Sequence, residues 1–185
     1  MDFVSSLRRK AAALDKTIVL PEGGDERTLR AAGAIVAEGF ARVILLGNLT
    51  DLGERLGALG IDPDRLTIID PVLSTYRTEF AREYFELRKA KGMTEAEAAK
   101  VMQAPLFFGA MLVRRGLADG MVAGAVNATG DVLRAGFQVV GTAPGTSLVS
   151  SCFVMVKPDW TCGDAGRLVF GDCAVNPQPT AAQLA

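Results

Sequence analysis

The sequence predicts an α/β protein whose mostly parallel sheet is flanked by helices. Three short apolar runs in the first half of the chain are each followed by apolar residues at helical spacing. A fourth run, rich in small residues, ends at a polar loop that leads into another helical segment. Strands of a parallel sheet are buried on both faces, so they appear as continuous apolar runs that alternate with helices. The predicted strands are Thr17 to Leu20, Val43 to Leu46, Leu66 to Ile69 and Gly120 to Val126.

The helices between these strands follow from apolar periodicity and from residues that begin or end helices. A first helix over residues 3–14 is amphipathic, and the next begins after Pro21 and ends at Gly39. A short helix follows the second strand, and the region before the fourth strand is helical throughout. The remaining predicted helices are Leu52 to Leu59, one carrying Tyr76, Phe80, Tyr84 and Leu87 on one face, one that starts at Thr94, and Pro105 to Val113.

The loop after the fourth strand is the first candidate binding site. Asn127, Thr129 and Gly130 favour a turn, Asp131 opens the next helix, and Arg134 follows within about a turn. A loop of this kind offers backbone N–H groups, a hydroxyl and here a guanidinium, which together favour an anion. Every βα junction needs turn residues, however, so the spacing leaves a purely structural role open.

A change of domain is predicted near the Pro-Gly turn at 144–145. We expect residues 1–143 to form an amino-terminal α/β domain and residues 144–185 to be the beginning of a second one. Thr146 and Ser147 add hydroxyl groups just after the turn, before an apolar run at 148–156 and a strand at 168–170. Thr180 and Gln183 have the spacing of a capping box, so a helix should begin where the chain ends. This segment is too short for a domain, and we expect most of the second domain to be missing.

Composition and charge exclude several classes of function. The chain has 20 Lys and Arg against 21 Asp and Glu, a formal net charge of -1, and no dense basic stripe that would indicate nucleic-acid binding. No apolar run is long enough to span a bilayer, and charges interrupt the amino terminus before a signal-peptide core could form. We therefore expect a cytoplasmic protein. Its cysteines, Cys152, Cys162 and Cys173, are odd in number and widely spaced, which argues against disulfides and against a CxxC metal site.

The chain contains no histidine, and this restricts its possible chemistry. Nucleophilic schemes based on Ser-His-Asp or Cys-His are excluded, as are histidine-ligated metals. A catalytic base must be a carboxylate, a lysine or a cysteine.

Several segments resemble, in the same order, those of the phosphate acetyltransferase (phosphotransacetylase) family. They are KTIVLPEGGDERTL, ILLGN, FELRKAKGMT, DGMVAGAVNATGDVLRAGFQVVGT and LVFGDCAVNPQPTAAQLA. The resemblance implies reversible acetyl transfer between acetyl-CoA and inorganic phosphate, giving acetyl phosphate and CoA. The resemblance further implies that no metal takes part in the chemical step and that no cofactor is bound, since CoA is a substrate. It also implies a homodimer with a two-domain fold like that of isocitrate and isopropylmalate dehydrogenases, with the active site between the domains.

The resemblance also implies roles for individual residues. Arg134 matches an arginine that holds phosphate or acetyl phosphate, and Arg88 matches one associated with CoA. The alternative for Arg134 is a surface ion pair with Asp131 or Glu38. Arg88 stands beside Lys89 and Lys91, where cations also complement a helix dipole. Supporting roles in anion binding or cleft shape fall to Asn127, Thr129, Gly130, Asp131, Thr146 and Ser147.

The family's catalytic aspartate, with its serine and arginine, belongs to a carboxyl-terminal half that this sequence lacks. The chain alone is therefore expected to be inactive. Two other functions stay open: a phosphate butyryltransferase or related acyltransferase, and a non-catalytic binding module derived from the family.

Overall fold

The computed structural model describes residues 2–146 and 148–184 of the 185-residue chain. The chain divides into two compact units, which are described separately: Arg8–Gly141, and Met1–Leu7 with Thr142–Ala185. The predicted domain boundary after residue 143 stays a prediction. In the described part of the chain, no helix has the length and apolarity that crossing a membrane requires.

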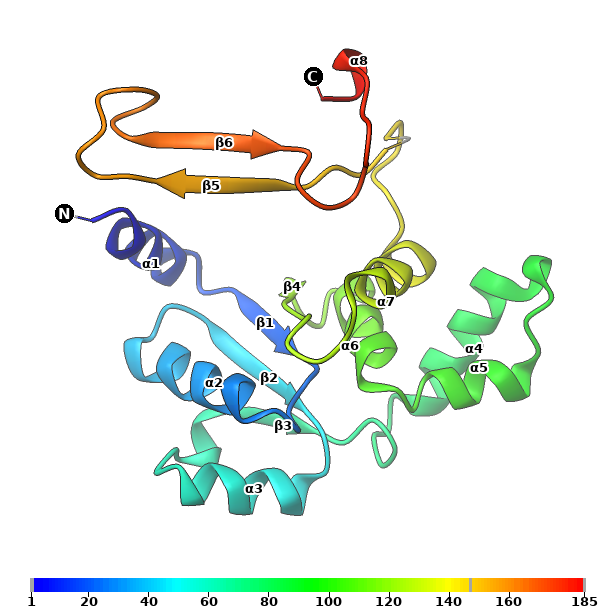
Figure 1. Cartoon of the computed structure of the whole chain (residues 1–185). Coiled ribbons are helices and arrows are strands. Elements are labelled where there is room, and N and C mark those ends of the chain that lie inside the picture. Colours follow the sequence, from blue (N-terminus) through cyan, green and yellow to red (C-terminus); the bar gives the residue numbers. More distant parts are fainter. Residues whose placement is uncertain (1, 147, 185) are drawn as a thin grey trace. The chain divides into compact units, whose positions relative to one another are not determined.

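The larger unit is built on a four-stranded parallel sheet (Figure 1). Its strands are β1 (Thr17–Leu20), β2 (Arg42–Leu46), β3 (Thr67–Ile69) and β4 (Gly120–Met121), in the order β3-β2-β1-β4. The predicted α/β fold with its parallel sheet is thus confirmed. The fourth strand is shorter than predicted, because the ladder ends where the amide of Val122 donates to the carbonyl of Val19 at 3.0 Å. The backbone amides of residues 124–127 donate to the side chain of Glu22 instead of to a neighbouring strand.

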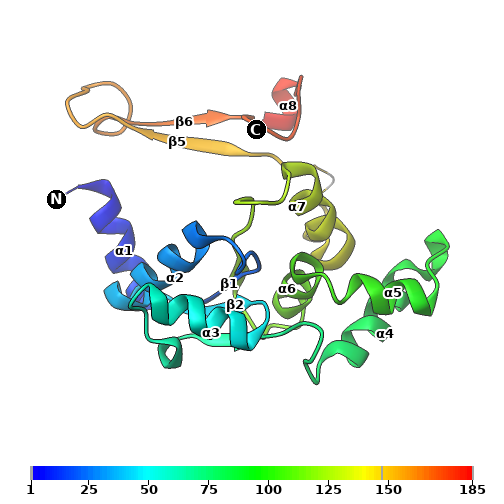
Figure 2. The ribbon, with the colours of Figure 1, turned by 60° about the horizontal axis from the view of Figure 1, so that its bottom comes forward.

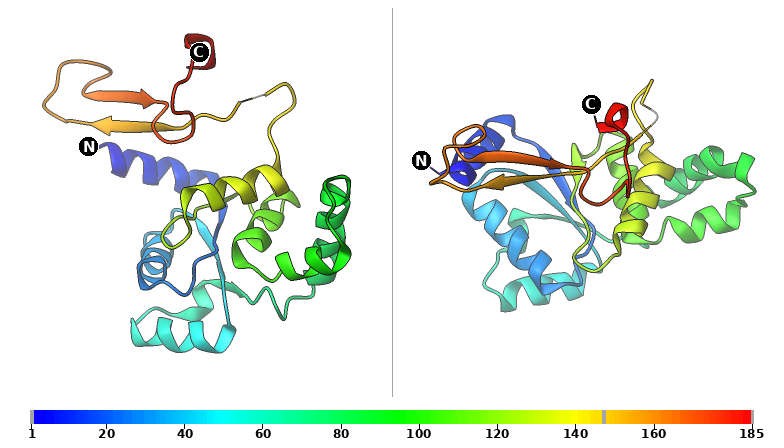
Figure 3. Two further views of the ribbon diagram at one scale, coloured as in Figure 1. Left: turned by 45° about the vertical axis from the view of Figure 1, so that its right-hand side comes forward. Right: turned by 45° about the horizontal axis from the view of Figure 1, so that its top comes forward.

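Helices lie on both faces of this sheet, as Figures 2 and 3 show. Alternate residues of a strand point to opposite faces, and two separate cores follow from this alternation. Val19, Ile44 and Leu46 pack in one core with residues of α4, α5, α6 and α7, whereas Leu20, Val43 and Leu45 pack in the other with α2 and α3. The helices are α1 (Phe3–Leu14), α2 (Glu26–Glu38), α3 (Leu49–Ala58), α4 (Arg77–Arg88), α5 (Glu95–Val101), α6 (Pro105–Arg114) and α7 (Thr129–Ala135), with short turns of 3-10 helix at Pro63–Arg65 and Lys89–Lys91.

Capping residues set the helix ends close to where the sequence places them. Thr94 and Glu97 form a reciprocal capping box at α5, and Gly39 ends α2 with a φ of 70°. Asn48 is the N-cap of α3, and its side chain accepts the N–H of Asp51. Helix α7 begins at Thr129 rather than at Asp131, which lies in its first turn, and it continues as a turn of π-helix over Gly136–Val140.

The smaller unit contains a two-stranded antiparallel hairpin of β5 (Cys152–Val156) and β6 (Arg167–Gly171), followed by α8 (Ala181–Leu184). The predicted helix start is confirmed, because Gln183 Oε1 accepts the backbone N–H of Thr180 at 2.8 Å. All side chains of β5 and most of β6 are exposed, for example Phe153 at 57% and Val169 at 71%. Short antiparallel strands of this kind are marginal without a packing partner.

Candidate functional site

Two pockets open at the carboxyl edge of the parallel sheet. The first, called here the Glu22 pocket, has a volume of about 420 Å³ and lies between the loops that follow β1 and β4 and the start of α6. The second, also of about 420 Å³, follows β2 and β3, and Pro105 borders both. Open α/β sheets bind ligands at this edge. The Glu22 pocket is lined by Pro21, Glu22, Gly24, Asp25, Ala104, Pro105, Leu106, Val126 and Asn127.

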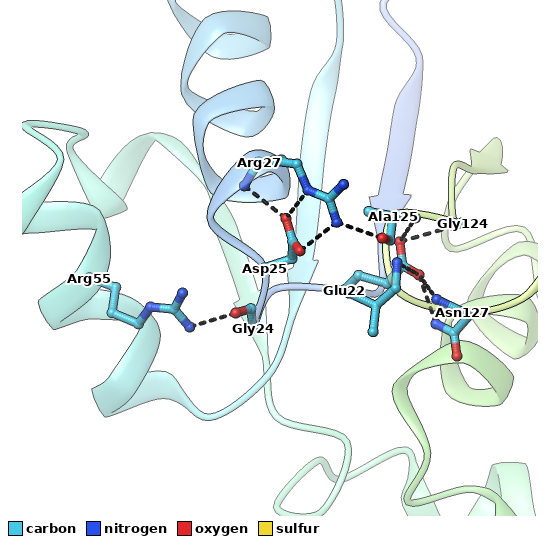
Figure 4. A network of polar contacts seen from close by, with 9 residues as sticks. Glu22, Gly24, Asp25, Arg27, Arg55, Gly124, Ala125 and Asn127 are labelled. Atoms are coloured by element: carbon cyan, nitrogen blue, oxygen red, sulfur yellow. Dashed lines mark hydrogen bonds and ion pairs between the residues drawn. The ribbon is translucent and has the colours of Figure 1, made fainter.

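Glu22 is the central polar residue of the first pocket, and it is only 8% exposed. Its Oε2 accepts the backbone N–H groups of Gly124 at 3.0 Å and Ala125 at 2.8 Å. Its Oε1 accepts those of Val126 at 3.0 Å and Asn127 at 2.8 Å, and also Nδ2 of Asn127 at 2.8 Å. Figure 4 shows the carboxylate enclosed by these donors. The loop after β4 therefore wraps a carboxylate that belongs to the chain itself.

These hydrogen bonds decide the charge of Glu22. Burial by itself raises the pKa of a carboxyl group, but the amides of residues 125–127 and the side chain of Asn127 outweigh it and lower the pKa of Glu22 to about 2. Glu22 is thus a fixed negative charge at neutral pH.

A second set of bonds ties the loop after β1 in place. Arg27 holds Asp25 through two parallel bonds, Nε to Oδ1 at 2.9 Å and Nη2 to Oδ2 at 2.8 Å, and its Nη2 also reaches the carbonyl of Ala125 at 2.6 Å. Arg55 donates to the carbonyl of Gly24 at 2.9 Å (Figure 4). A Cβ at Gly23 would lie 2.5 Å from the carbonyl oxygen of Leu46, so this loop needs glycine to pass so close to β2. The two loops form one rigid wall of the pocket.

The structure corrects one expectation about the loop after β4. The sequence predicted free N–H groups there for an anion, but the backbone N–H groups of residues 124–127 and Nδ2 of Asn127 donate to Glu22. The reason is an intramolecular carboxylate that local sequence does not reveal. Thr129 and Gly130 are exposed in the first turn of α7, and Asp131 donates its N–H to Ala128. Their substrate-binding roles, and that of Asn127, stay predictions.

Arg134 makes the surface ion pair that was its alternative role. Its Nη1 lies 3.0 Å from Oδ1 of Asp131, and the two side chains are 60% and 46% exposed. A pair this exposed is typically worth less than about 1 kcal/mol, so it holds the guanidinium only weakly. Glu38, the other partner considered, pairs with Arg8 at 2.7 Å. Phosphate binding by Arg134 stays a prediction.

Arg88 is the last residue of α4 and is partly buried. Its Nε is buried and has no hydrogen-bond partner within the described residues. A buried N–H without a partner is costly and rare, so this atom marks a place where a ligand oxygen would be favoured. One turn earlier, Tyr84 donates its hydroxyl to Oε1 of Gln138 at 2.7 Å. Lys89 pairs with Glu86, so the neighbouring cation is already engaged.

The two hydroxyl groups predicted near the domain boundary belong to Thr146 and Ser147. Thr146 belongs to the smaller unit, is exposed, and donates its N–H to Ala143 at 2.9 Å in a turn. Ser147 lies outside the described residues. Their supporting roles stay predictions.

The segment GDCAVNP in the smaller unit has a structural explanation. Asp172 accepts the N–H groups of Ala174, Val175 and Asn176 and the hydroxyl of Ser151, and these bonds hold its pKa well below its usual range. Asn176 donates Nδ2 to the carbonyl of Val149 at 2.9 Å. The carboxylate therefore joins the chain before β5 to the chain after β6.

A parallel sheet with pockets along its carboxyl edge and a buried, unpartnered arginine nitrogen is typical of α/β proteins that bind small ligands. The sequence model described as "Phosphate acetyl/butaryl transferase" matches residues 2–185, and the chain belongs to this family and corresponds to its amino-terminal portion.

Known proteins support this assignment over the whole chain. The chain is 45% identical to a phosphate acetyltransferase of Thermoanaerobacterium thermosaccharolyticum and 44% identical to one of Clostridium acetobutylicum. Each alignment covers 100% of this chain and 56% of the relative. A phosphotransacetylase structure from Streptococcus pyogenes superposes with a TM-score of 0.89 at 38% identity, covering 99% of this chain and 55% of that one. The EutD phosphotransacetylase of Staphylococcus aureus gives a TM-score of 0.84 at 36% identity, covering 97% of this chain and 52% of that one. This chain thus spans about half the length of these proteins.

Proposed function

We propose that this chain forms part of a phosphate acetyltransferase, which transfers an acetyl group reversibly between acetyl-CoA and inorganic phosphate. The observation that carries the proposal is the 45% identity over 100% of the chain to a relative of that name. The buried Nε of Arg88 supports the proposal, because it has no hydrogen-bond acceptor among the described residues, and the phosphate oxygens of CoA or of inorganic phosphate would provide one.

In the proposed reaction the CoA thiol loses its proton to a base and its sulfur attacks the acetyl carbon of acetyl phosphate. The C–S bond forms, the C–O bond breaks, and phosphate leaves with the bonding electron pair. Arg134 stabilises the growing charge on phosphate, and Arg88 holds CoA. The resemblance to the family assigns the base, a carboxylate of raised pKa, to a segment that this chain does not contain. Because transfer is direct, no enzyme nucleophile is required.

The proposal includes the assembly and setting of the enzyme. We place the chain in a two-domain fold like that of isocitrate and isopropylmalate dehydrogenases, in a cytoplasmic homodimer without a bound cofactor. The family description covers butyryl as well as acetyl transfer, so a phosphate butyryltransferase is the second candidate. The names of the two relatives favour the acetyl group. A non-catalytic binding module is the third candidate, since the chain spans 56% of those relatives.

An activity assay tests this proposal. The 185-residue chain is compared with a chimera in which it is joined to the remaining segment of the T. thermosaccharolyticum relative. We expect little or no activity from the chain alone, because the base is absent, and thioester formation from acetyl phosphate and CoA by the chimera. A folded but inactive chimera would contradict an enzymatic role. A preference for butyryl phosphate would favour the second candidate.

Replacing Arg88 by alanine in the chimera should raise KM for CoA more than it lowers kcat. A charge-assisted hydrogen bond contributes about 1.5–3 kcal/mol, which corresponds to an increase of roughly 10- to 100-fold. Lys89→Ala is the matched control, since it removes a neighbouring charge that is already paired with Glu86. A fall in kcat at unchanged KM for CoA would assign Arg88 to the chemical step instead.

A further inference from the structure

Most hydrogen-bond donors of the two loops beside the Glu22 pocket are already in use. The amides of residues 124–127 donate to Glu22, and Arg27 donates to Asp25 and to the carbonyl of Ala125. Asn127 donates both its backbone N–H and its Nδ2 to Glu22. Its Oδ1 accepts no hydrogen bond within residues 2–146 and 148–184 (Figure 4). Among the described residues, Oδ1 of Asn127 is therefore a free acceptor on the polar wall of the pocket.

The charge of the lining residues points the same way. Glu22 and Asp25 are the charged residues among them, and both carboxyl groups have a pKa lowered to about 2. Arg27 neutralises Asp25, but the charge of Glu22 has no cation bound to it among the described contacts. A phosphate placed here would be repelled by the uncompensated charge of Glu22. The remaining lining is apolar: Pro21, Ala104, Pro105, Leu106 and Val126.

Glu22 also decides which end of the Asn127 amide is available. An ionised carboxylate only accepts hydrogen bonds, whereas an amide has a donor end and an acceptor end. The Nδ2 end must therefore face Glu22, and the Oδ1 end is left for another group. A neutral glutamine at position 22 would bring its own NH2 group towards the loop donors and would release this constraint.

We propose that Glu22 is a positioning residue that turns Oδ1 of Asn127 outward and makes this pocket a site for a neutral hydrogen-bond donor on an apolar chain, while excluding anions. The identity of the ligand rests on the proposed function: the substrate group with neutral donors on an apolar chain is the pantetheine arm of CoA, whose amides carry N–H groups. Inorganic phosphate then binds elsewhere.

The test follows NMR shifts of the ¹⁵N-labelled 185-residue chain during titration with pantetheine or with inorganic phosphate. Pantetheine should shift the Asn127 side-chain amide and the Val126 and Leu106 amides in a saturable way, and phosphate should not. Asn127→Leu should weaken pantetheine binding about tenfold, the value of one hydrogen bond of about 1.4 kcal/mol, while the Gly124 and Ala125 amides keep their shifts. Glu22→Gln should also weaken pantetheine binding, and it should change the amide shifts of Gly124 and Ala125.

Glu97→Gln is the matched control. Glu97 also accepts a backbone N–H, that of Thr94 at 2.9 Å, but it does not line the pocket, so both titrations should be unchanged. Any of three results would overturn the inference. Phosphate could shift the Asn127 signals, Asn127→Leu could bind pantetheine with wild-type affinity, or pantetheine could cause no saturable shifts. If Glu22→Gln does not fold, Asn127→Leu still decides. Failure of the proposed function is seen separately, as an inactive chimera.

Discussion

Replacing Arg134 by glutamine in the chimera is expected to lower kcat for acetyl transfer by about 100-fold or more. Removing one group that stabilises developing charge in an active site typically costs about 10²–10³ in kcat. Arg134→Lys should recover only part of this loss, because lysine keeps the charge but presents a single flexible donor instead of a planar fork. Steady-state kinetics with varied acetyl phosphate measure both effects.

The competing role of Arg134 is the exposed ion pair with Asp131 at 3.0 Å. Two controls separate the roles. Arg8→Gln removes a comparable pair, 2.7 Å from Glu38 with side chains 50% and 41% exposed, and should leave kcat unchanged. Asp131→Asn removes the partner but keeps the guanidinium. If Arg134 only forms a surface pair, then Arg134→Gln and both controls all retain near wild-type kinetics, and the phosphate assignment is wrong.

The sheet was predictable because its signal is local. Each of the runs at 17–20, 43–46 and 66–69 is apolar over a few residues and is followed by helical spacing, and a parallel sheet is the arrangement that buries such strands. The capping-box spacing of Thr180 and Gln183 predicted a helix start, and the helix predicted to start at Thr94 begins there with Thr94 as its N-cap. The family resemblance added the motifs that the comparisons support.

The Glu22 cluster was not predictable in the same way. Glu22 and the amides it binds are separated by 102 to 105 residues, and only the pairing of β1 with β4 brings them together. A carboxylate directly after a strand, facing the edge where ligands bind, was the one available signal in PEGGDER. The same bonds explain why β4 ends at Met121 although the apolar run continues to Val126.

Glu22→Gln is also expected to destabilise the folded chain by about 3 kcal/mol at neutral pH, and this loss should depend on pH. The pKa of Glu22 is lowered from its ordinary value of 4.5 to about 2. This shift means that folding stabilises the ionised form over the protonated form by about 3 kcal/mol. Above pH 4.5 the carboxylate is ionised in both folded and unfolded chains, and its contribution is complete. As the pH falls from about 4.5 to about 2, the unfolded chain takes up the proton first, and the contribution is lost.

Urea unfolding followed by far-ultraviolet circular dichroism, repeated between pH 7 and pH 2.5, measures this dependence. The free-energy difference between wild type and Glu22→Gln should be largest at pH 7 and shrink steadily below pH 4.5. Glu97→Gln removes an exposed carboxylate whose pKa is also lowered, by its bonds to Thr94, and it should show a much smaller difference because solvent screens that group. A difference for Glu22→Gln that is constant with pH would mean that the five donors hold the glutamine as well as the carboxylate. The charge of Glu22 would then have no part in fixing the loop after β4.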